Sequence, residues 1–327
     1  MSKDYKFNFK GSIENMQKKL RYLGRRIGDI GGVEQYLGQW YNGKYIIYGS
    51  LGNLWVYKFN GSSFTLMSSY DSIGYDIWGD GTYIYVAAGT QGIKAFTCGR
   101  QGELTLKGSQ DDGGTYVKLW GHGGYIYAAN ISEGIQAYSF DGSDFTLLDE
   151  LDNGGTYWSL YGDDSYIYTA VGTDGIRAYS FDGSDLALEG SDDQGGTYYD
   201  VYCQNGYIFA SNVDDLLAYT FDGDDFTLKD SDSDSNRVGG DGKYIYSAKT
   251  TLKAYEFEND TLTEFDERDD GDGSFYDILA GTSDGYIHVA GFYEIKAYKL
   301  REIFALSVAG AGKLRTTGTG TMKTASD

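Results

Sequence analysis

Few residues in this chain have the types and spacing that catalysis requires. Its 327 residues include only two histidines, His122 and His288, and no GxSxG, HExxH or CxxC motif occurs. Such motifs mark the nucleophile–base and zinc chemistries of many hydrolases. An enzyme would instead have to bring together polar residues such as Arg237, His288 and Glu294. We expect these residues to be non-catalytic, and the protein not to be an enzyme.

Oxygen-bearing side chains alternate in the sequence KDSDSDSNR. Oxygen ligands at alternate positions resemble the opening of a calcium-binding loop. The ligands would be Asp230, Asp232, Asp234 and Asn236. The glycine of such a loop is replaced by Ser235, and no glutamate stands at its twelfth position. Calcium is the only cofactor that the sequence suggests, and a solvated acidic turn is the favoured interpretation.

The N-terminus combines basic residues with a stripe of apolar ones. Residues 1–26 carry eight basic and two acidic side chains. From Ser12 to Gly28, apolar residues recur at spacings of three and four, which predicts an amphipathic helix. Two heptads are too short for a stable free coiled coil, so the helix needs a surface to lie on. The expected contact residues are Ile13, Met16, Leu20, Leu23, Ile27, Arg25 and Arg26.

A repeat organises the rest of the chain. A tyrosine-rich segment occurs seven times, starting at Tyr45, Tyr83, Tyr125, Tyr166, Tyr207, Tyr244 and Tyr286. These starts are 38, 42, 41, 41, 37 and 42 residues apart. A second segment follows each, as in Ile-Gln-Ala-Tyr138, and DG, NG or GG turns lie between them. Such turns favour hairpins because they permit positive φ. Four short strands per repeat form one propeller blade, and seven blades close a ring.

We therefore predict an all-β fold, a seven-bladed β-propeller of four-stranded blades over residues 35–308. A basic arm and short helix over 1–34 precede it, and a Gly/Thr-rich tail over 309–327 follows. Residues 300–308 are expected to supply the strand after the second segment of the last blade. Which blade contains both chain ends is left open.

Aromatic residues fall into two groups. One repeat position is aromatic in five successive blades, at Trp40, Trp78, Trp120, Tyr161 and Tyr202. Repetition at a fixed strand position predicts packing between blades. Trp55 and Trp158 break the repeat, and we expect them on a contact surface. Exposed tyrosine and tryptophan offer a flat apolar face and a polar group, which suits a glycan or a host surface receptor.

Charge limits the range of partners. The chain has 27 basic and 48 acidic residues and a net charge of −21, while residues 27–308 alone carry 16 basic and 45 acidic residues. A body this acidic repels phosphate backbones, so we expect no nucleic acid on the propeller. No apolar run is long enough to span a membrane, and no signal peptide is visible. We expect synthesis in the cytoplasm.

The order of the repeated segments resembles a known group of propellers. A GG-Tyr turn, DG-Tyr-Ile-Tyr-Ala-Ala and Gly-Ile-x-Ala-Tyr look like LVIVD-type repeats and like YVTN and lactonase-like propellers. The chain departs from the LVIVD pattern at its Asp-Pro, where Phe-Asp-Gly or Phe-Asn-Gly stands and proline is absent. The resemblance implies the architecture and carries over no functional residue. The two arms look like attachment arms of virion structural proteins.

These observations favour a non-catalytic function. We expect a structural or binding propeller, held to other protein subunits through residues 1–30 and 309–327. A virion capsid or tail component with a decoration or attachment role fits, as does another large assembly. A lactonase-like hydrolase is the alternative from another class, and a cytoplasmic protein-interaction scaffold of the WD-repeat kind is a third.

Overall fold

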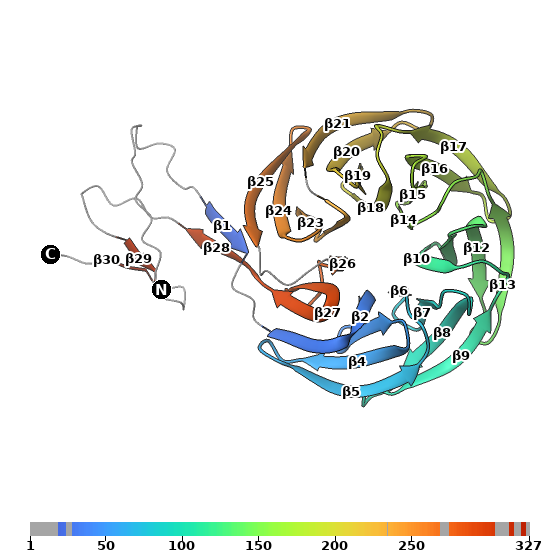
Figure 1. The fold of residues 1–327 in the computed structure, drawn as a ribbon, viewed down its shortest axis with the longest axis horizontal. Coiled ribbons are helices and arrows are strands. Elements are labelled where there is room, and N and C mark those ends of the chain that lie inside the picture. The colour runs from blue at the N-terminus through green and yellow to red at the C-terminus, as the bar shows by residue number, and fades with distance from the viewer. Residues whose placement is uncertain are drawn as a thin grey trace.

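The computed structural model describes residues 19–23, 28–233, 235–268, 275–304, 314–316 and 322–324. In these ranges the chain forms thirty strands and no helix. Antiparallel sheets surround a common axis and form a disc, so the predicted seven-bladed β-propeller is confirmed (Figure 1). Within the same ranges, no helix has the length and apolarity that a membrane span requires.

Blades 2 to 6 are four-stranded antiparallel meanders whose strands follow one another in chain order. Blade 2 contains β6 (Asp76–Gly79), β7 (Ile84–Ala87), β8 (Ile93–Cys98) and β9 (Leu104–Gln110). Blade 3 contains β10 (Tyr116–His122), β11 (Tyr125–Asn130), β12 (Gly134–Phe140) and β13 (Phe145–Leu151). Blade 4 contains β14 (Ser159–Gly162), β15 (Ile167–Ala170), β16 (Ile176–Phe181) and β17 (Leu186–Asp192). Blade 5 contains β18 (Tyr198–Gln204), β19 (Tyr207–Asn212), β20 (Asp215–Phe221) and β21 (Phe226–Ser233), and blade 6 contains β22 (Arg237–Gly240), β23 (Tyr244–Ala248), β24 (Leu252–Glu258) and β25 (Thr261–Arg268).

Blades 1 and 7 share one long strand, which closes the ring. The C-terminal half of β2 (Gly28–Tyr41) is the innermost strand of blade 1, followed by β3 (Ile46–Ser50), β4 (Asn53–Phe59) and β5 (Phe64–Asp71). The N-terminal residues 28–31 of β2 instead pair with residues 294–297 of β27 (Ile287–Tyr298). Together with β26 (Phe275–Leu279), they complete blade 7. The prediction that residues 300–308 would supply the last strand of this blade is therefore wrong.

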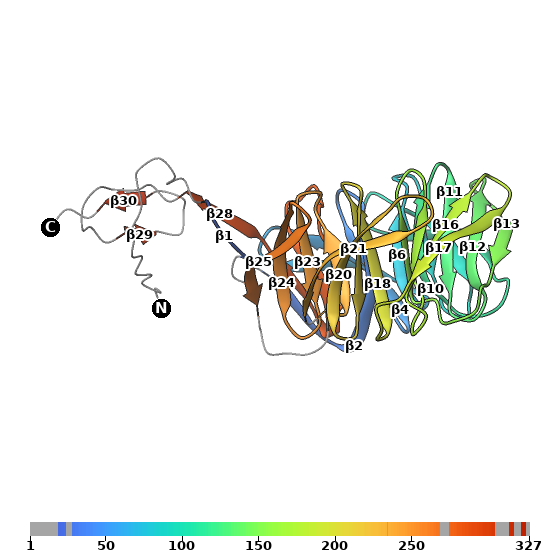
Figure 2. The same ribbon diagram turned by 90° about the horizontal axis from the view of Figure 1, so that it is seen from above.

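A two-stranded ribbon leaves the rim where the ring closes. Strand β1 (Lys19–Leu23) pairs antiparallel with β28 (Leu300–Phe304), and this ribbon lies beside β25 at the rim (Figures 1 and 2). In the tail, β29 (Leu314–Thr316) pairs with β30 (Met322–Thr324).

The helix predicted from Ser12 to Gly28 is wrong where the structure describes the segment. Residues 19–23 form β1, and Gly28 begins β2. The sequence KLRYL also fits the two-residue period of a strand. A short helix would be only marginally stable by itself, whereas pairing with β28 gives the backbone groups of this segment hydrogen-bond partners. Leu20 and Leu23 therefore lie on a strand. The other expected contact residues lie outside the described residues: Ile13, Met16, Arg25, Arg26 and Ile27.

The hydrophobic core lies between neighbouring blades. The tyrosine that ends the second repeated segment is fully buried in five blades, as Tyr138, Tyr179, Tyr219, Tyr255 and Tyr298. One cluster joins Trp120 and Tyr127 of blade 3 to Leu160 and Ile167 of blade 4. Each blade thus buries its faces only against its neighbours, and this requirement imposes the same residue types in every repeat.

Candidate functional site

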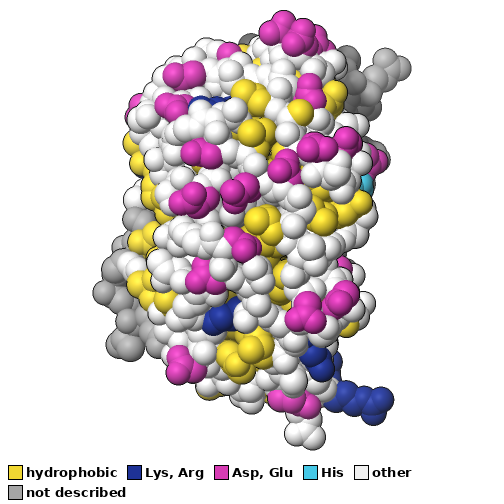
Figure 3. All heavy atoms as spheres, turned by 90° about the vertical axis from the view of Figure 1, so that its right-hand side faces the viewer, with side chains coloured by type: hydrophobic (Ala, Val, Ile, Leu, Met, Phe, Trp, Pro, Cys, Tyr) yellow, Lys and Arg dark blue, Asp and Glu magenta, His cyan; other side chains and the backbone are white. Residues whose placement is uncertain are grey.

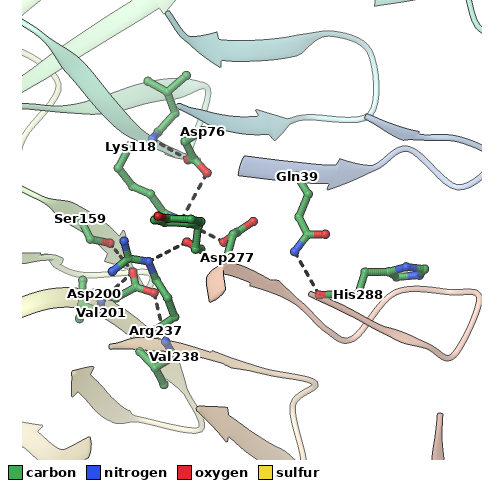
Figure 4. A network of polar contacts seen from close by, with 12 residues as sticks. Gln39, Asp76, Lys118, Ser159, Asp200, Val201, Arg237, Val238, Asp277 and His288 are labelled. Atoms are coloured by element: carbon green, nitrogen blue, oxygen red, sulfur yellow. Dashed lines mark hydrogen bonds and ion pairs between the residues drawn. The ribbon is translucent and has the colours of Figure 1, made fainter. Parts of the chain in front are cut away.

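The innermost strands bring one side chain from most blades to the axis of the disc (Figure 4). These residues occupy one position of the repeat, two before Trp78, Trp120, Tyr161 and Tyr202 in blades 2 to 5 and two before Gly239 and Leu279 in blades 6 and 7. We call them the axial ring: Asp76, Lys118, Ser159, Asp200, Arg237 and Asp277, with Gly38 at the equivalent place in blade 1. The ring contains three carboxylates and two cations. Each cation belongs to a blade whose neighbour in the ring carries a carboxylate at the same position.

Lys118 connects three blades. Its Nζ lies 3.3 Å from Asp76 Oδ1 in blade 2 and 3.8 Å from Asp277 Oδ1 in blade 7. Burial alone would lower the pKa of Lys118, but the nearby carboxylates outweigh it and raise that pKa above its usual value. Lys118 is therefore charged at every physiological pH. Asp76 Oδ2 also accepts a 2.9 Å hydrogen bond from the Leu119 amide, which fixes blade 2 against blade 3.

Asp200 makes the corresponding connection on the other side of the ring. Its Oδ1 accepts hydrogen bonds from Ser159 Oγ at 2.6 Å and from the Val201 amide at 3.0 Å. Its Oδ2 accepts the Val238 amide at 3.1 Å, so one carboxylate holds blades 4, 5 and 6 together. Hydrogen bonds to a charged acceptor are stronger than neutral ones. Asp200 therefore has a structural role in the ring.

Arg237 binds backbone carbonyls of its own and the next blade. Its Nε donates to Tyr276 O at 2.6 Å and its Nη1 to Asn236 O at 2.8 Å. The bond to Tyr276 ties Arg237 to β26, the strand that carries Asp277 (Figure 4).

Asp277, the third carboxyl of the ring, lies farther from Lys118 than Asp76 does. Its distance of 3.8 Å from Lys118 Nζ is beyond hydrogen-bonding range, and 11% of its side chain is exposed. Burial raises the pKa of Asp277 to about 7, against the opposing effect of Lys118, and the charges of Asp76 and Asp200 raise it further. This carboxyl can therefore gain or lose a proton near neutral pH.

An array of aromatic residues lies next to the axial ring. Trp40 and Trp78 have ring centroids 6.4 Å apart, and Tyr161 lies 5.7 Å from Trp120 and 4.9 Å from Tyr202. These contacts cross from blade to blade, so the predicted packing between blades is confirmed for this position.

Glycine follows the aromatic residue in several repeats for a steric reason. A Cβ on Gly121 would lie 2.3 Å from Cη2 of Trp78, and a Cβ on Gly162 would lie 2.5 Å from Cζ3 of Trp120. Each indole therefore occupies the space that a side chain would fill in the next blade. Blade 5 has Cys203 at this position, beside Tyr161 of the preceding blade.

The polar residues proposed from the sequence lie in different places. Arg237 belongs to the axial ring. His288 is fully buried between blades 7 and 1, where its Nε2 lies 2.9 Å from Asp284 Oδ2 and its ring faces Phe59 at 5.5 Å. The side chain of Glu294 lies outside the described residues. His122 is half exposed and stacks on Trp120 with an interplanar angle of 6°. Among the described side chains, Arg237, His288 and His122 lie apart and do not form one constellation.

Two aspartates of the acidic segment proposed for calcium accept hydrogen bonds from backbone amides. Asp230 Oδ2 accepts the Leu262 amide at 2.7 Å, and Asp232 Oδ1 accepts the Ser233 amide at 2.6 Å. Asp234 lies outside the described residues, and Asn236 precedes β22. In the part of the chain that the structure describes, no group of three or more His, Cys, Asp and Glu side chains could hold a metal ion.

The two tryptophans proposed as surface residues differ in exposure. Trp158 is 38% exposed, and its ring centroid lies 6.4 Å from that of Tyr199. Trp55 is half-buried in β4, against the cluster that contains Tyr48 and Ile295. Only Trp158 therefore presents a large part of its ring to solvent.

Sequence reasoning did not find the axial ring. Its members differ in charge and size from blade to blade, so they do not belong to any repeated sequence motif. A signal was nevertheless available, because the position two residues before Trp78, Trp120, Tyr161 and Tyr202 can be compared directly.

Comparisons with known proteins support the architecture. No family model and no curated protein matches the chain. Among solved structures, the computationally designed Ika8 protein is similar at a TM-score of 0.61 and 10% identity, over 84% of this chain and 100% of Ika8. The WD40 β-propeller domain of Doa1 is similar at a TM-score of 0.66 and 11% identity, over 87% of this chain and 97% of that domain. Raptor from Chaetomium thermophilum is similar at a TM-score of 0.67 and 11% identity, over 86% of this chain and 30% of Raptor.

These similarities define the class of protein. The chain is a seven-bladed β-propeller whose fold resembles both designed and WD40 propellers. At 10–11% identity the likeness concerns the fold alone.

Proposed function

We propose that this protein is a non-catalytic assembly component, a rigid acidic propeller held to other protein subunits by its terminal arms. The observation that carries the proposal is the β1–β28 ribbon at the rim, next to β25 (Figure 2). It holds residues 19–23 and 300–304 together, so the two terminal segments connect to the disc at one place. We infer that they act as one tether. The proposal includes a decoration or attachment role in a virion or another large assembly.

The charge distribution supports the same proposal. Residues 1–26 carry a net charge of +6, whereas residues 27–308 carry −29. The positive arm of one subunit attracts the acidic body of another, whereas two acidic bodies repel each other. A contact of this kind weakens as the salt concentration rises.

Limited proteolysis with trypsin tests the proposal. The first 26 residues contain eight lysines and arginines, all of which are cleavage sites. We expect the arms to be cleaved rapidly in dilute protein and to become protected as the concentration rises, while the propeller resists throughout. Equal cleavage at every concentration would count against an assembly role. It would favour the third alternative, a cytoplasmic interaction scaffold that does not use its arms.

A lactonase-like hydrolase is the second candidate, and Asp277 is the observation that favours it. A carboxyl with a pKa near 7 close to the axis of a propeller is suited to general acid–base chemistry. The resemblance of the repeats to lactonase-like propellers points the same way. A turnover screen on sugar lactones and phosphoesters tests this candidate. Activity that disappears in Asp277→Asn would support it, and the assembly proposal predicts no turnover.

A further inference from the structure

A belt of exposed leucines runs around the rim of the disc. The residues occupy one position of the outermost strands in four blades: Leu66 on β5, Leu106 on β9, Leu188 on β17 and Leu228 on β21. Their exposed fractions are 50%, 39%, 41% and 38%. Blade 3 has the half-buried Leu147 at this position. We call these five residues the rim leucines. Single exposed leucines are ordinary on protein surfaces, but repetition at a single position is not.

The backbone explains why these side chains turn outward. Each rim leucine pairs with the aromatic residue that ends the second repeated segment, as Leu66 does with Tyr57 and Leu188 with Tyr179. The ladder register shifts immediately afterwards, so each outer strand has a β-bulge there. A bulge bends the strand and redirects the neighbouring side chains.

The strands that carry the rim leucines also have free edges. In the described sheets, β5, β9, β13, β17 and β21 each pair on one side only. A free edge offers unpaired amide and carbonyl groups to an incoming strand. On the side of the rim opposite the termini, hydrophobic patches lie among acidic side chains (Figure 3). Such a surface fits a segment that is both apolar and basic.

The protein contains a segment of this kind at its N-terminus. Tyr5, Phe7 and Phe9 alternate with Lys6 and Lys10, which predicts a strand with one aromatic face. Fully extended, residues 1–18 span up to about 60 Å, enough to reach across a neighbouring rim. The same end of the chain already provides a rim strand, because residues 28–31 complete blade 7.

Blade 6 has no leucine at the rim position. The equivalent of the rim leucine is Glu264, which lies 3.2 Å from Lys253 Nζ. Strand β1 of the same chain lies beside β25, the outer strand of this blade. The leucines are thus present on blades that the chain's own N-terminal strand does not approach.

From these observations we propose that residues 1–18 of one copy bind the rim leucines of a second copy. This inference rests on the assembly function and names its partner, another molecule of the same chain. The contact is heterologous, since an arm meets a rim, and heterologous contacts build rings or filaments. The bound segment adds to the free outer edge of one blade and covers the leucine of that blade with its aromatic residues.

Two full-length variants and their mixture test the proposal by sedimentation velocity. The rim variant carries Leu106→Ser, Leu188→Ser and Leu228→Ser, and the arm variant carries Tyr5→Ser, Phe7→Ser and Phe9→Ser. Each should be monomeric where the parent assembles, with a dissociation constant raised about tenfold or more. Mixed together, an intact arm and an intact rim remain available, so the mixture should form a one-to-one dimer and nothing larger.

Leu51→Ser is the matched control. Leu51 is 51% exposed but lies between β3 and β4, away from the outer strands. This variant should assemble like the parent, and all variants should keep its melting temperature because the altered residues are exposed or lie outside the propeller.

The possible outcomes separate the two proposals. A rim variant that assembles like the parent would overturn the leucine contact and leave the assembly function intact. Two monomeric variants that fail to form a dimer on mixing would also overturn it, because arm and rim would not be partners. A parent that stays monomeric at every concentration would overturn both proposals.

Discussion

Single residues in the axial ring determine how the inner edges of the blades are held together. Asp76 and Asp200 accept amides from the next blade, and Lys118 lies between two carboxylates. Removing one partner of a buried ion pair leaves an uncompensated charge and is more costly than replacing the whole pair. Burial raises the pKa of Asp277 to about 7, so its charge changes near neutral pH, and burial also raises the pKa of Asp76.

The pKa of Asp277 predicts a pH-dependent stability. Its value is about 7 in the folded protein and 3.8 in an unfolded chain. The folded state therefore retains a proton between these values, and the stabilising contribution is present at low pH and lost as the pH rises through 7. Asp277→Asn removes this dependence. Its melting temperature should exceed that of the parent by a few degrees at pH 8, with a smaller difference at pH 5.

Thermal melts of both proteins between pH 5 and 8 provide the measurement. Asp71→Asn, which alters an exposed aspartate of β5, is the control and should show a constant difference from the parent. A constant difference for Asp277→Asn as well would contradict the assignment of the shifted pKa to this residue.

At the scale of strands, the contact between an aromatic residue and the next blade's glycine is the most restrictive feature. Gly121→Ala places a methyl group 2.3 Å from the Trp78 ring. Such overpacking should lower the free energy of unfolding by about 1–3 kcal/mol. Gly52→Ala is the control, because a Cβ there meets nothing within 4 Å. Chemical denaturation measures both, and an equal effect of the two substitutions would contradict the steric account.

The closing strand gives a second prediction at this scale. Deleting residues 1–31 removes the strand that pairs with residues 294–297 and exposes an edge of blade 7. Deleting residues 1–18 leaves that pairing in place. We expect the shorter deletion to keep the parent's melting temperature and the longer one to lower it by several degrees. Equal melting temperatures would mean that the strand does not contribute to ring closure.

The strands that could be predicted from the sequence are those whose buried residues recur at the same positions in every blade. The seven segments that begin with tyrosine were recognisable because every blade buries the same side chains against its neighbours. Turns were also recognisable, since Asp141 and Asp182 each accept amides two and three residues later in the same DGSD context.

The remaining elements depend on contacts between distant parts of the chain. Strand β1 pairs with β28 at the other end of the sequence, and a local spacing of three and four in this segment predicted a helix instead. The closing strand at Gly28 carries no repeat signal, because it stands alone before the first blade. Lys118 and Asp277 lie close together across the axis, although they are far apart in the sequence. Their opposite charges complement each other through this long-range contact, which no local sequence pattern reveals.

At the scale of the whole molecule, the disc and its arms have separate roles. Much of the negative charge comes from aspartates that shape turns, and backbone amides lower the pKa values of Asp141, Asp182 and Asp222. The disc is therefore acidic partly because its hairpins require aspartate. The terminal segments are basic and connect to the disc through the β1–β28 ribbon, so positive and negative charge are concentrated in separate parts of the chain.

The native mass by light scattering tests the central claim most directly. The comparison is between the full chain and a chain of residues 19–304, which keeps the closing strand and the β1–β28 ribbon. The account predicts that the full chain exceeds its monomer mass of 36.1 kDa and that the trimmed chain is a monomer of unchanged stability. Monomers in both cases, or the same oligomer in both, would contradict assembly through the arms.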